Sequence, residues 1–206
     1  MSEHTNRALA EHRDYTSSKL GMWLFLFTEI LLFGGLFLVY SVYRTMHAAD
    51  FHEAARELDT VIGAVNTAIL LTSSLTMAIS ISALQRGNRT LSIWMQSATI
   101  LLGIVFLVNK YVEWSAKFHH GLYPNAPELL ERSNGQILFY GLYYVMTGLH
   151  GLHVVAGLAL IGIMLAMTIR GTVNSGEYGR LENAGLYWHL VDLIWIYLFP
   201  LFYLIT

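Results

Sequence analysis

The segment LGMWLFLFTEILLFGGLFLVYSVY, residues 20–43, contains a single charged residue, Glu29. A helix of about 20 apolar residues is long enough to cross the hydrocarbon core of a bilayer, and Glu29 falls near the middle of this run. An ionised carboxylate at that depth costs at least about 2.5 kcal/mol. The sequence therefore predicts a membrane-spanning helix in which Glu29 is protonated, paired or next to water. Glu29 is also a candidate functional residue.

The whole chain has the composition of an integral membrane protein. Of its 206 residues, 55% are hydrophobic and 13% are charged, whereas an average soluble domain carries about 25% charged residues. The net charge of -2 gives no indication of nucleic-acid binding. The absence of cysteine excludes disulfides, thiolate-bound metal centres and covalent haem attachment through C-x-x-C-H. Any cofactor would need histidine, methionine or carboxylate ligands.

Four further apolar segments follow the first. We predict an all-α protein: a polytopic membrane helix bundle of five transmembrane helices that forms one domain, residues 1–206. The predicted spans cover residues 20–43, 61–84, 91–114, 136–168 and 184–206. The first run is longer than the 7 to 15 residues of a signal-peptide core, so we expect it to remain in the mature protein.

The basic residues beside the spans predict an orientation. Seven of them fall on the side of the N terminus and five on the other side. By the positive-inside rule, we expect a cytoplasmic N terminus and a C terminus outside the cell. The two sets are Arg7, Arg13, Lys19, Arg86, Arg89, Arg170 and Arg180, and Arg44, Arg56, Lys110, Lys117 and Arg132.

Two longer loops are expected on the outer side. In HAADFHEAARELDT, residues 47–60, Phe51, Ala54 and Leu58 recur at helical spacing among charged residues. This pattern fits either a short helix at the membrane surface or a solvated loop. Residues 117–134 contain two prolines, and we expect irregular chain there.

The fourth span carries two histidines and several glycines. His150 and His153 are three residues apart, with Gly157 one turn farther along the same face. We expect this stripe to face protein. Gly148, Gly151 and Gly157 are candidates for helix packing, because glycine lets neighbouring backbones approach closely.

The fifth span carries His189 and Asp192, again three residues apart. Intramembrane histidines can ligate haem or a metal. A ligand set needs three or four groups and an ordered second shell, so we favour a structural polar network of His150, His153, His189 and Asp192. No catalytic residue, cofactor or metal site is predicted. Glu113, beside Trp114, is expected to be an interfacial or packing residue and, with Glu29, a candidate buried or proton-related carboxylate.

Four segments together resemble one known family. They are FLFTEILLFGGLFLVY (25–40), VNTAILLTSS (65–74), MTGLHGLHVVAG (146–157) and YWHLVDLIWIYLFPLFY (187–203). Their content and order resemble subunit III of the haem-copper terminal oxidases, the cytochrome c oxidase subunit 3 family, in its short five-helix bacterial form. The resemblance covers essentially the whole membrane region.

The resemblance implies a non-catalytic accessory subunit of a proton-pumping terminal oxidase in aerobic respiratory electron transport. Such a subunit binds no haem or copper, which we expect in partner subunits. It supports assembly, holds structural phospholipids and sustains proton uptake, and the carboxylate matching Glu29 is linked to the last role. The implied partners are the catalytic subunit I, subunit II, other small subunits and a donor complex in a supercomplex. The implied location is the bacterial inner membrane, with multiple crossings.

Other functions stay open at this point. A nitric oxide reductase has an accessory subunit with the same helices. An independent proton channel or transporter could use Glu29 and the histidines as relay groups, and a haem-binding anchor could use the histidines as ligands. Lys110, Lys117, His119 and His120 depart from the family pattern and are candidates for contacts with a partner peculiar to this complex.

Overall fold

The long apolar runs of the sequence form five long helices in a computed structural model, which describes residues 2–205 and the side chains of residues 16–205. Seven helices and no strand occur within residues 2–205. They are α1 (Ser2–Met46), α2 (Ala48–Arg56), α3 (Thr60–Gln85), α4 (Arg89–His119), α5 (Pro127–Leu130), α6 (Asn134–Arg170) and α7 (Gly179–Tyr203). Helices α1, α3, α4, α6 and α7 are long and apolar enough to cross a membrane. The prediction of an all-α protein with five spans is confirmed.

Local chemistry fixes where the helices begin and end. The Asp59 carboxylate accepts hydrogen bonds from the N–H groups of Val61 (2.9 Å) and Ile62 (3.1 Å) at the start of α3. Ser133 is the N-cap residue of α6. At the other end of α6, Gly171 has a φ of 81°, a left-handed conformation that glycine adopts without steric cost. These caps satisfy backbone groups that the helix ends would otherwise leave unpaired.

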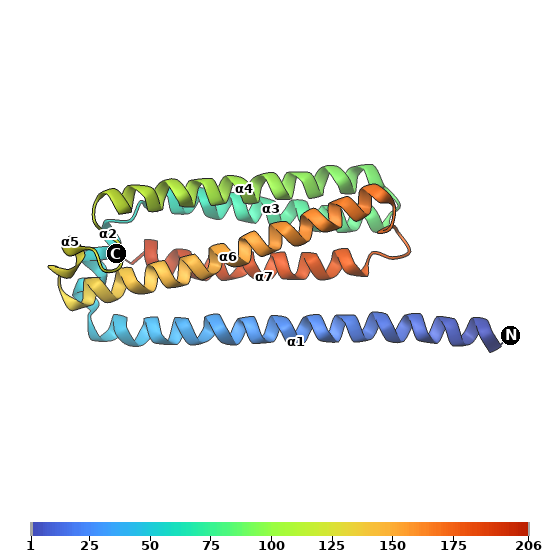
Figure 1. Ribbon diagram of the computed structural model, residues 1–206, viewed down its shortest axis with the longest axis horizontal. Helices are drawn as coiled ribbons and strands as arrows, with labels where there is room; N and C mark the ends of the chain where they lie inside the picture. The colour runs from blue at the N-terminus through green and yellow to red at the C-terminus, as the bar shows by residue number, and fades with distance from the viewer. Residues whose placement is uncertain (1, 206) are drawn as a thin grey trace.

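Four long helices form a bundle, and the fifth, α1, lies along its side. Helix α3 packs against α4 and α7, and α6 packs against the same two helices, while α1 runs along one side of the bundle next to α6 and α7 (Figure 1). Of the most apolar eighteen residues, 56% are buried in α7 but only 11% in α1. Helix α7 is therefore the core of the bundle, and α1 is its peripheral element.

Side-chain contacts near both ends and in the middle hold α1 to the bundle. At the end near the N terminus, Lys19 Nζ lies 2.9 Å from Glu182 Oε2 of α7. At the other end, the Tyr40 hydroxyl donates a hydrogen bond to the carbonyl oxygen of Leu201. In the middle, the attachment is made by Glu29. Ring contacts add to these bonds: Phe25 stacks on Tyr187 and Phe37 contacts Tyr197, with 5.9 and 6.0 Å between ring centroids.

The segment 47–60 forms a helix, which decides between the two structures that its pattern allowed. Phe51 and Ala54 are buried on the face of α2 that packs against α6. The Phe51 ring lies edge-on to Tyr40, with 5.5 Å between ring centroids, and to Phe139, with 5.4 Å. Helix α2 therefore closes one end of the bundle.

The prediction of irregular chain over 117–134 is wrong in two places. Helix α4 continues to His119, and Pro127 opens the short helix α5. Proline is tolerated in the first turn of a helix because the N–H it lacks has no intrahelical partner there. The Lys117 amine turns inward and donates to the carbonyl oxygen of Glu57, so the end of α4 is fixed by tertiary contact.

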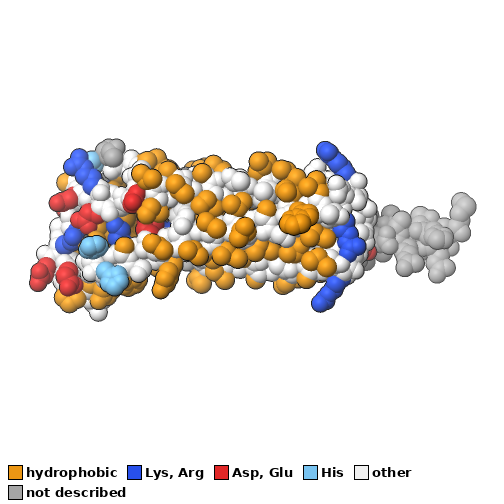
Figure 2. Space-filling model, turned by 90° about the horizontal axis from the view of Figure 1, so that it is seen from above, with side chains coloured by type: hydrophobic (Ala, Val, Ile, Leu, Met, Phe, Trp, Pro, Cys, Tyr) orange, Lys and Arg blue, Asp and Glu red, His pale blue; other side chains and the backbone are white. Residues whose placement is uncertain are grey.

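The surface has the distribution of side chains expected for a membrane protein. A broad band of hydrophobic side chains separates two charged ends, and basic side chains gather at the end where α3 and α4 meet (Figure 2). Large apolar side chains such as Trp23, Leu24 and Leu101 are exposed within this band. Exposed apolar surface of this extent requires a lipid or protein covering. The chain is a multi-pass membrane protein.

Candidate functional site: two buried carboxylates

Glu29 has a partner within the chain. Its Oε2 atom lies 2.9 Å from Nε2 of His153, which joins α1 to α6 in the middle of the apolar band. The two side chains are 14% and 15% exposed. The Phe33 ring lies edge-on to the imidazole, with 5.3 Å between ring centroids. Of the three states that the sequence allowed for Glu29, the structure shows the paired one.

The second nitrogen of His153 determines where the proton of this pair can lie. His153 Nδ1 is 2.8 Å from the carbonyl oxygen of Leu149, and a carbonyl oxygen can only accept a hydrogen bond. Nδ1 therefore carries a hydrogen. In the neutral imidazole, Nε2 then accepts, and Glu29 must be the protonated donor; in the imidazolium, Nε2 donates to the Glu29 carboxylate.

Both states of the Glu29–His153 pair hold one proton between Oε2 and Nε2, and both have zero net charge. A shift of that proton across a 2.9 Å hydrogen bond leaves no uncompensated charge in the apolar band. The pair can therefore hold one proton in the apolar band without net charge, at lower cost than an isolated ionised carboxylate.

Glu113 lies in a different environment, inside the four-helix bundle. Lys110, one turn earlier on α4, donates to Glu113 Oε2 at 3.0 Å, to the Tyr143 hydroxyl at 3.1 Å and to the Tyr203 hydroxyl at 2.9 Å. Because a lysine ammonium has three N–H donors, every donor is used. The two tyrosines donate in turn to Glu113 Oε1, at 2.7 and 2.5 Å. This buried cluster of four residues links α4, α6 and α7.

The sequence did not reveal the buried cluster. It predicted Glu113 as an interfacial or packing residue and a candidate buried carboxylate, and left Lys110 and Lys117 as candidates for contacts with a foreign partner. That interpretation is wrong for both lysines, because each is buried and bonded within the chain. The i, i+3 spacing of Lys110 and Glu113 was the available signal, since such pairs share one helix face. The tyrosine partners come from distant helices and had no local signal.

The four residues expected to form a polar network do not bond to one another within the described part of the chain. The His150 ring is buried between Phe106 and Trp195, with 5.7 and 5.3 Å between ring centroids. Neither of its nitrogens has a hydrogen-bond partner among the described residues. His150 therefore lies in an aromatic pocket and makes no hydrogen bond to the Glu29–His153 pair.

His189 and Asp192 lie on α7 near α3. His189 Nδ1 is 2.6 Å from the Ser74 hydroxyl. The same serine is the polar neighbour of Asp192, but neither carboxyl oxygen of this buried aspartate makes a hydrogen bond of normal geometry to a described residue. Within residues 16–205, no three or more His, Asp or Glu side chains are arranged to hold a metal ion.

The hydroxyl-rich helix α3 provides acceptors for the tryptophans of α7. The Trp188 indole N–H donates to Ser73 Oγ, and that of Trp195 donates to Thr67 Oγ1, both at 3.0 Å. Buried indoles usually find such a partner. The small polar residues of α3 thus fix the two large rings at the centre of the bundle.

The three packing glycines differ in their surroundings. A Cβ added at Gly157 would lie 2.8 Å from the Trp188 ring, and one at Gly148 would lie 3.2 Å from Trp114. At Gly151, an added Cβ would meet no heavy atom within 4 Å. The neighbouring ring therefore requires glycine at position 157 and leaves little room for a Cβ at position 148. At position 151, no contact within the described chain requires glycine.

Comparisons with known proteins agree with the family that the sequence motifs resemble. The model of the family described as cytochrome c oxidase subunit III matches residues 3–206. The cytochrome c oxidase subunit 3 of Synechocystis sp. is 38% identical over 191 residues, 90% of this chain and 74% of that protein. The probable quinol oxidase subunit 3 of Staphylococcus haemolyticus is 29% identical over 209 residues, 100% of this chain and 97% of that protein.

A third relative has a different chain organisation. The heme-copper oxidase subunit I+III of Aeropyrum pernix is 28% identical over 203 residues, which make up 95% of this chain but 24% of that protein. The family match extends over nearly the whole chain and all five spans. Together with the membrane-spanning helices, it shows that the chain belongs to the cytochrome c oxidase subunit III family and is a subunit III of haem-copper respiratory oxidases.

Proposed function

We propose that this subunit sustains proton uptake by the catalytic subunit of a bacterial terminal oxidase, and that Glu29 and His153 are the residues through which it does so. The observation that carries the proposal is the Glu29–His153 pair, which shares one proton in the middle of the apolar band. Glu29 lies on α1, the helix least covered by the rest of the chain, and His153 faces it from α6. A neighbouring subunit or lipid can therefore reach it, whereas the Glu113 cluster is enclosed.

The catalytic subunit I is the proposed direct neighbour. The Aeropyrum pernix relative is named as subunits I and III in a single chain, and fusion in one chain supports close association of the corresponding separate chains. We expect haem and copper in the partner subunits, contacts with subunit II and other small subunits, and structural phospholipids on the apolar surface. A donor complex in a supercomplex is a further proposed partner.

The proposed location is the bacterial inner membrane, with a cytoplasmic N terminus. The support is the basic side chains at the end of the bundle where α3 meets α4, which is also the end of α1 nearest the N terminus (Figures 1 and 2). Basic residues gather on the cytoplasmic side of membrane proteins. In this orientation, the end with α2 and α5 faces the periplasm.

The comparisons do not favour the alternative functions. The relatives described above are named as oxidase subunits, not as subunits of a nitric oxide reductase or as transporters. The first test is purification of the tagged chain from its native membrane. We expect a larger haem-copper subunit to co-purify and to give a haem spectrum. Recovery of the chain as a stable monomer without that subunit would contradict the proposal.

The role of Glu29 is tested in the purified oxidase. Glu29→Gln keeps a hydrogen-bonding group beside His153 but cannot release a proton. We expect normal subunit stoichiometry together with slower proton uptake or faster inactivation during turnover, and the difference should depend on pH. Glu177→Gln is the matched control, because it removes an exposed carboxylate outside the five spans. A Glu29→Gln enzyme with the wild-type turnover number and inactivation rate at every pH would overturn the role.

A further inference from the structure

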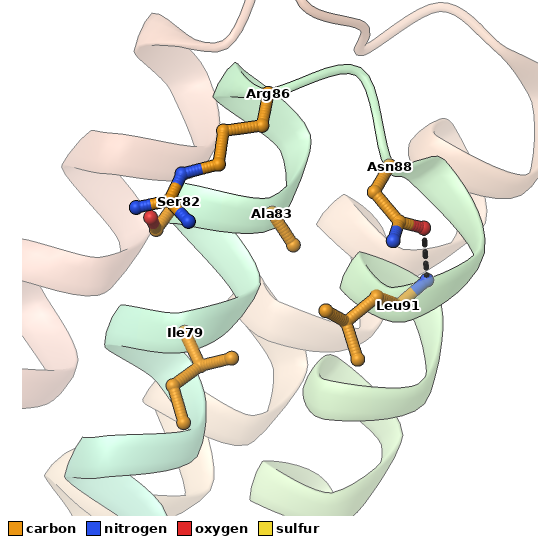
Figure 3. A pocket seen from close by; sticks show the side chains of 6 residues that line it. All are labelled: Ile79, Ser82, Ala83, Arg86, Asn88 and Leu91. Atoms are coloured by element: carbon orange, nitrogen blue, oxygen red, sulfur yellow. Dashed lines mark hydrogen bonds between the residues drawn. The ribbon is translucent and has the colours of Figure 1, made fainter.

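The turn between α3 and α4 forms a pocket of about 520 Å³ at the basic end of the bundle (Figure 3). Its lining combines polar and apolar side chains from both helices. The lining residues are Ile79, Ser82, Ala83, Arg86, Asn88 and Leu91. Neither the Glu29–His153 pair nor the Glu113 cluster contributes to it.

Hydrogen-bond donors in this pocket have no partner among the side chains that the structure describes, residues 16–205. Neither the Arg86 guanidinium nor the Ser82 hydroxyl makes a hydrogen bond or ion pair to a described residue, and both side chains line the pocket (Figure 3). The Asn88 side-chain oxygen accepts from the Leu91 N–H at 3.1 Å, which leaves the amide NH₂ free to donate. The pocket therefore presents a cation and neutral donors but no acidic side chain.

The nearby Arg89, by contrast, has hydrogen-bond partners within the chain. Arg89 Nε donates to the Thr168 carbonyl oxygen at 2.8 Å, and its second guanidinium nitrogen donates to the Ile169 carbonyl oxygen. Arg89 is thus used to bind the end of α6. Arg86, three residues earlier, is exposed, and its guanidinium bonds to no group within the described residues.

The lower wall of the pocket is apolar. Ile79 and Leu91 are 37% and 39% exposed, and in Figure 3 Ile79 of α3 and Leu91 of α4 lie below the Arg86 guanidinium. Because both helices continue from there as membrane spans, this wall borders the hydrocarbon, while Arg86 lies at the polar boundary. The pocket thus changes from cationic to apolar in the direction of the bilayer interior.

We propose that this pocket binds the headgroup of an anionic phospholipid. Arg86 contacts the phosphate, because a guanidinium presents several donors in a geometry that matches phosphate oxygens. Ser82 and the Asn88 amide donate to further headgroup oxygens, and the first acyl carbons cover Ile79 and Leu91. Basic pockets between transmembrane helices bind anionic lipid headgroups in this way. The inference is independent of the role proposed for Glu29.

A lipid fits the pocket better than free phosphate does. Inorganic phosphate would satisfy Arg86 but would leave the apolar wall exposed to water, at a cost proportional to the apolar area. A phospholipid satisfies both parts with one molecule, and it reaches the pocket directly from the surrounding bilayer. The source of the phosphate is therefore the membrane.

The test measures lipid binding to the intact oxidase complex by native mass spectrometry, with phosphatidylglycerol or phosphatidylcholine added to the detergent. We expect preferential retention of phosphatidylglycerol by the wild type and about five-fold weaker retention in Arg86→Gln, the effect of removing one basic contact. Arg180→Gln removes an exposed arginine at the same end but outside the pocket. This control should bind as the wild type does.

A second variant separates a lipid from free phosphate. Leu91→Ser keeps Arg86 but removes part of the apolar wall, so it should also weaken phosphatidylglycerol retention. Equal binding of phosphatidylglycerol by the wild type and Arg86→Gln would overturn the proposal, as would equal loss in Arg180→Gln. Binding of inorganic phosphate alone, lost in Arg86→Gln but unchanged in Leu91→Ser, would assign the pocket to free phosphate and overturn the lipid.

Discussion

Glu29 and Glu113 are two buried carboxylates in one chain, and their surroundings differ in every respect that matters for function. Glu29 lies on the peripheral helix α1 and has one side-chain partner, His153. Glu113 lies inside the bundle, and its oxygens accept from Lys110, Tyr143 and Tyr203. The comparison shows that burial alone does not define the role of a carboxylate. Its role depends on how many groups bond to it and on whether a neighbouring molecule can reach it.

The physical basis of this difference is the cost of moving a proton. In the Glu113 cluster, the ammonium and carboxylate neutralise each other and all three lysine donors are used. Taking a proton away would leave an unpaired buried charge. Taking a proton from the Glu29–His153 pair would also change its net charge, but this pair is joined by one side-chain hydrogen bond and lies beside the peripheral helix α1, where a neighbouring group can accept the proton. The cluster is therefore suited to holding helices together, and the pair is suited to proton exchange.

The largest expected effect is breakage of the buried cluster. Glu113→Leu leaves the Lys110 ammonium buried without a counter-charge, and we expect a loss of about 3–5 kcal/mol in the free energy of unfolding. Unfolding in mixed detergent micelles measures this. The double variant Lys110→Met/Glu113→Leu should recover most of the loss, because an apolar pair of similar volume removes both charges. Equal stability of the single variant and the wild type would contradict the assignment.

A smaller loss of stability is expected when a methyl group is added to Gly157, the glycine of α6 that packs against Trp188. Gly157→Ala places a methyl group 2.8 Å from the Trp188 ring, and overpacking of this kind costs about 1–3 kcal/mol. Gly151→Ala is the matched control, since it adds the same methyl group in open space. Thermal unfolding of the two variants should differ clearly. A Gly157→Ala protein as stable as Gly151→Ala would show that the bundle relaxes around Trp188.

Loss of the Glu29–His153 hydrogen bond should affect stability less than loss of the cluster. Polar contacts between membrane helices contribute about 0.6 kcal/mol on average and about 1.7 kcal/mol at most. Glu29→Leu should therefore destabilise the chain by no more than this, in the same micelle assay. A loss as large as that of Glu113→Leu would mean that the pair is a structural element, and it would remove the contrast between the two carboxylates.

The smallest effect is expected outside the membrane, where Glu57 meets Arg132 at 2.6 Å and the Tyr140 hydroxyl at 2.7 Å. Burial acts to raise the pKa of Glu57, but hydrogen bonds from Arg132 and Tyr140 outweigh it and lower the pKa below its ordinary value of 4.5. A carboxyl with a lowered pKa stabilises the fold above that ordinary value, and the contribution disappears as the pH falls through the folded-state pKa.

Arg132→Gln tests this pH dependence. Because the ion pair is partly exposed, the variant should lose about 0.5 kcal/mol at neutral pH. The difference from the wild type should vanish in acid well below pH 4.5, where Glu57 is protonated in both proteins. Unfolding measured across this pH range provides the test. A difference that is constant with pH would show that Arg132 acts through packing alone.

Much of the architecture could be predicted from the sequence, because membrane spans are set by local composition. Each span needs about 20 apolar residues whatever its neighbours are, and all five predicted spans lie within helices of the structure, except that the fifth ends beyond the last helical residue, Tyr203. The loops were less predictable. The α2 pattern allowed two structures, and the end of α4 is fixed by the contact of Lys117 with Glu57, which is 60 residues away in sequence.

The sequence by itself determined the membrane class, the five helices, the family and the special position of Glu29, because each depends on residue types along one continuous segment. Only the tertiary structure decided that Glu29 meets His153, 124 residues away, that Lys110 belongs to an internal cluster, and that Arg86 bonds to none of the described residues. Pairing between helices depends on how each helix is rotated and placed against the others. That arrangement follows from the packing of the whole bundle, and no single segment encodes it.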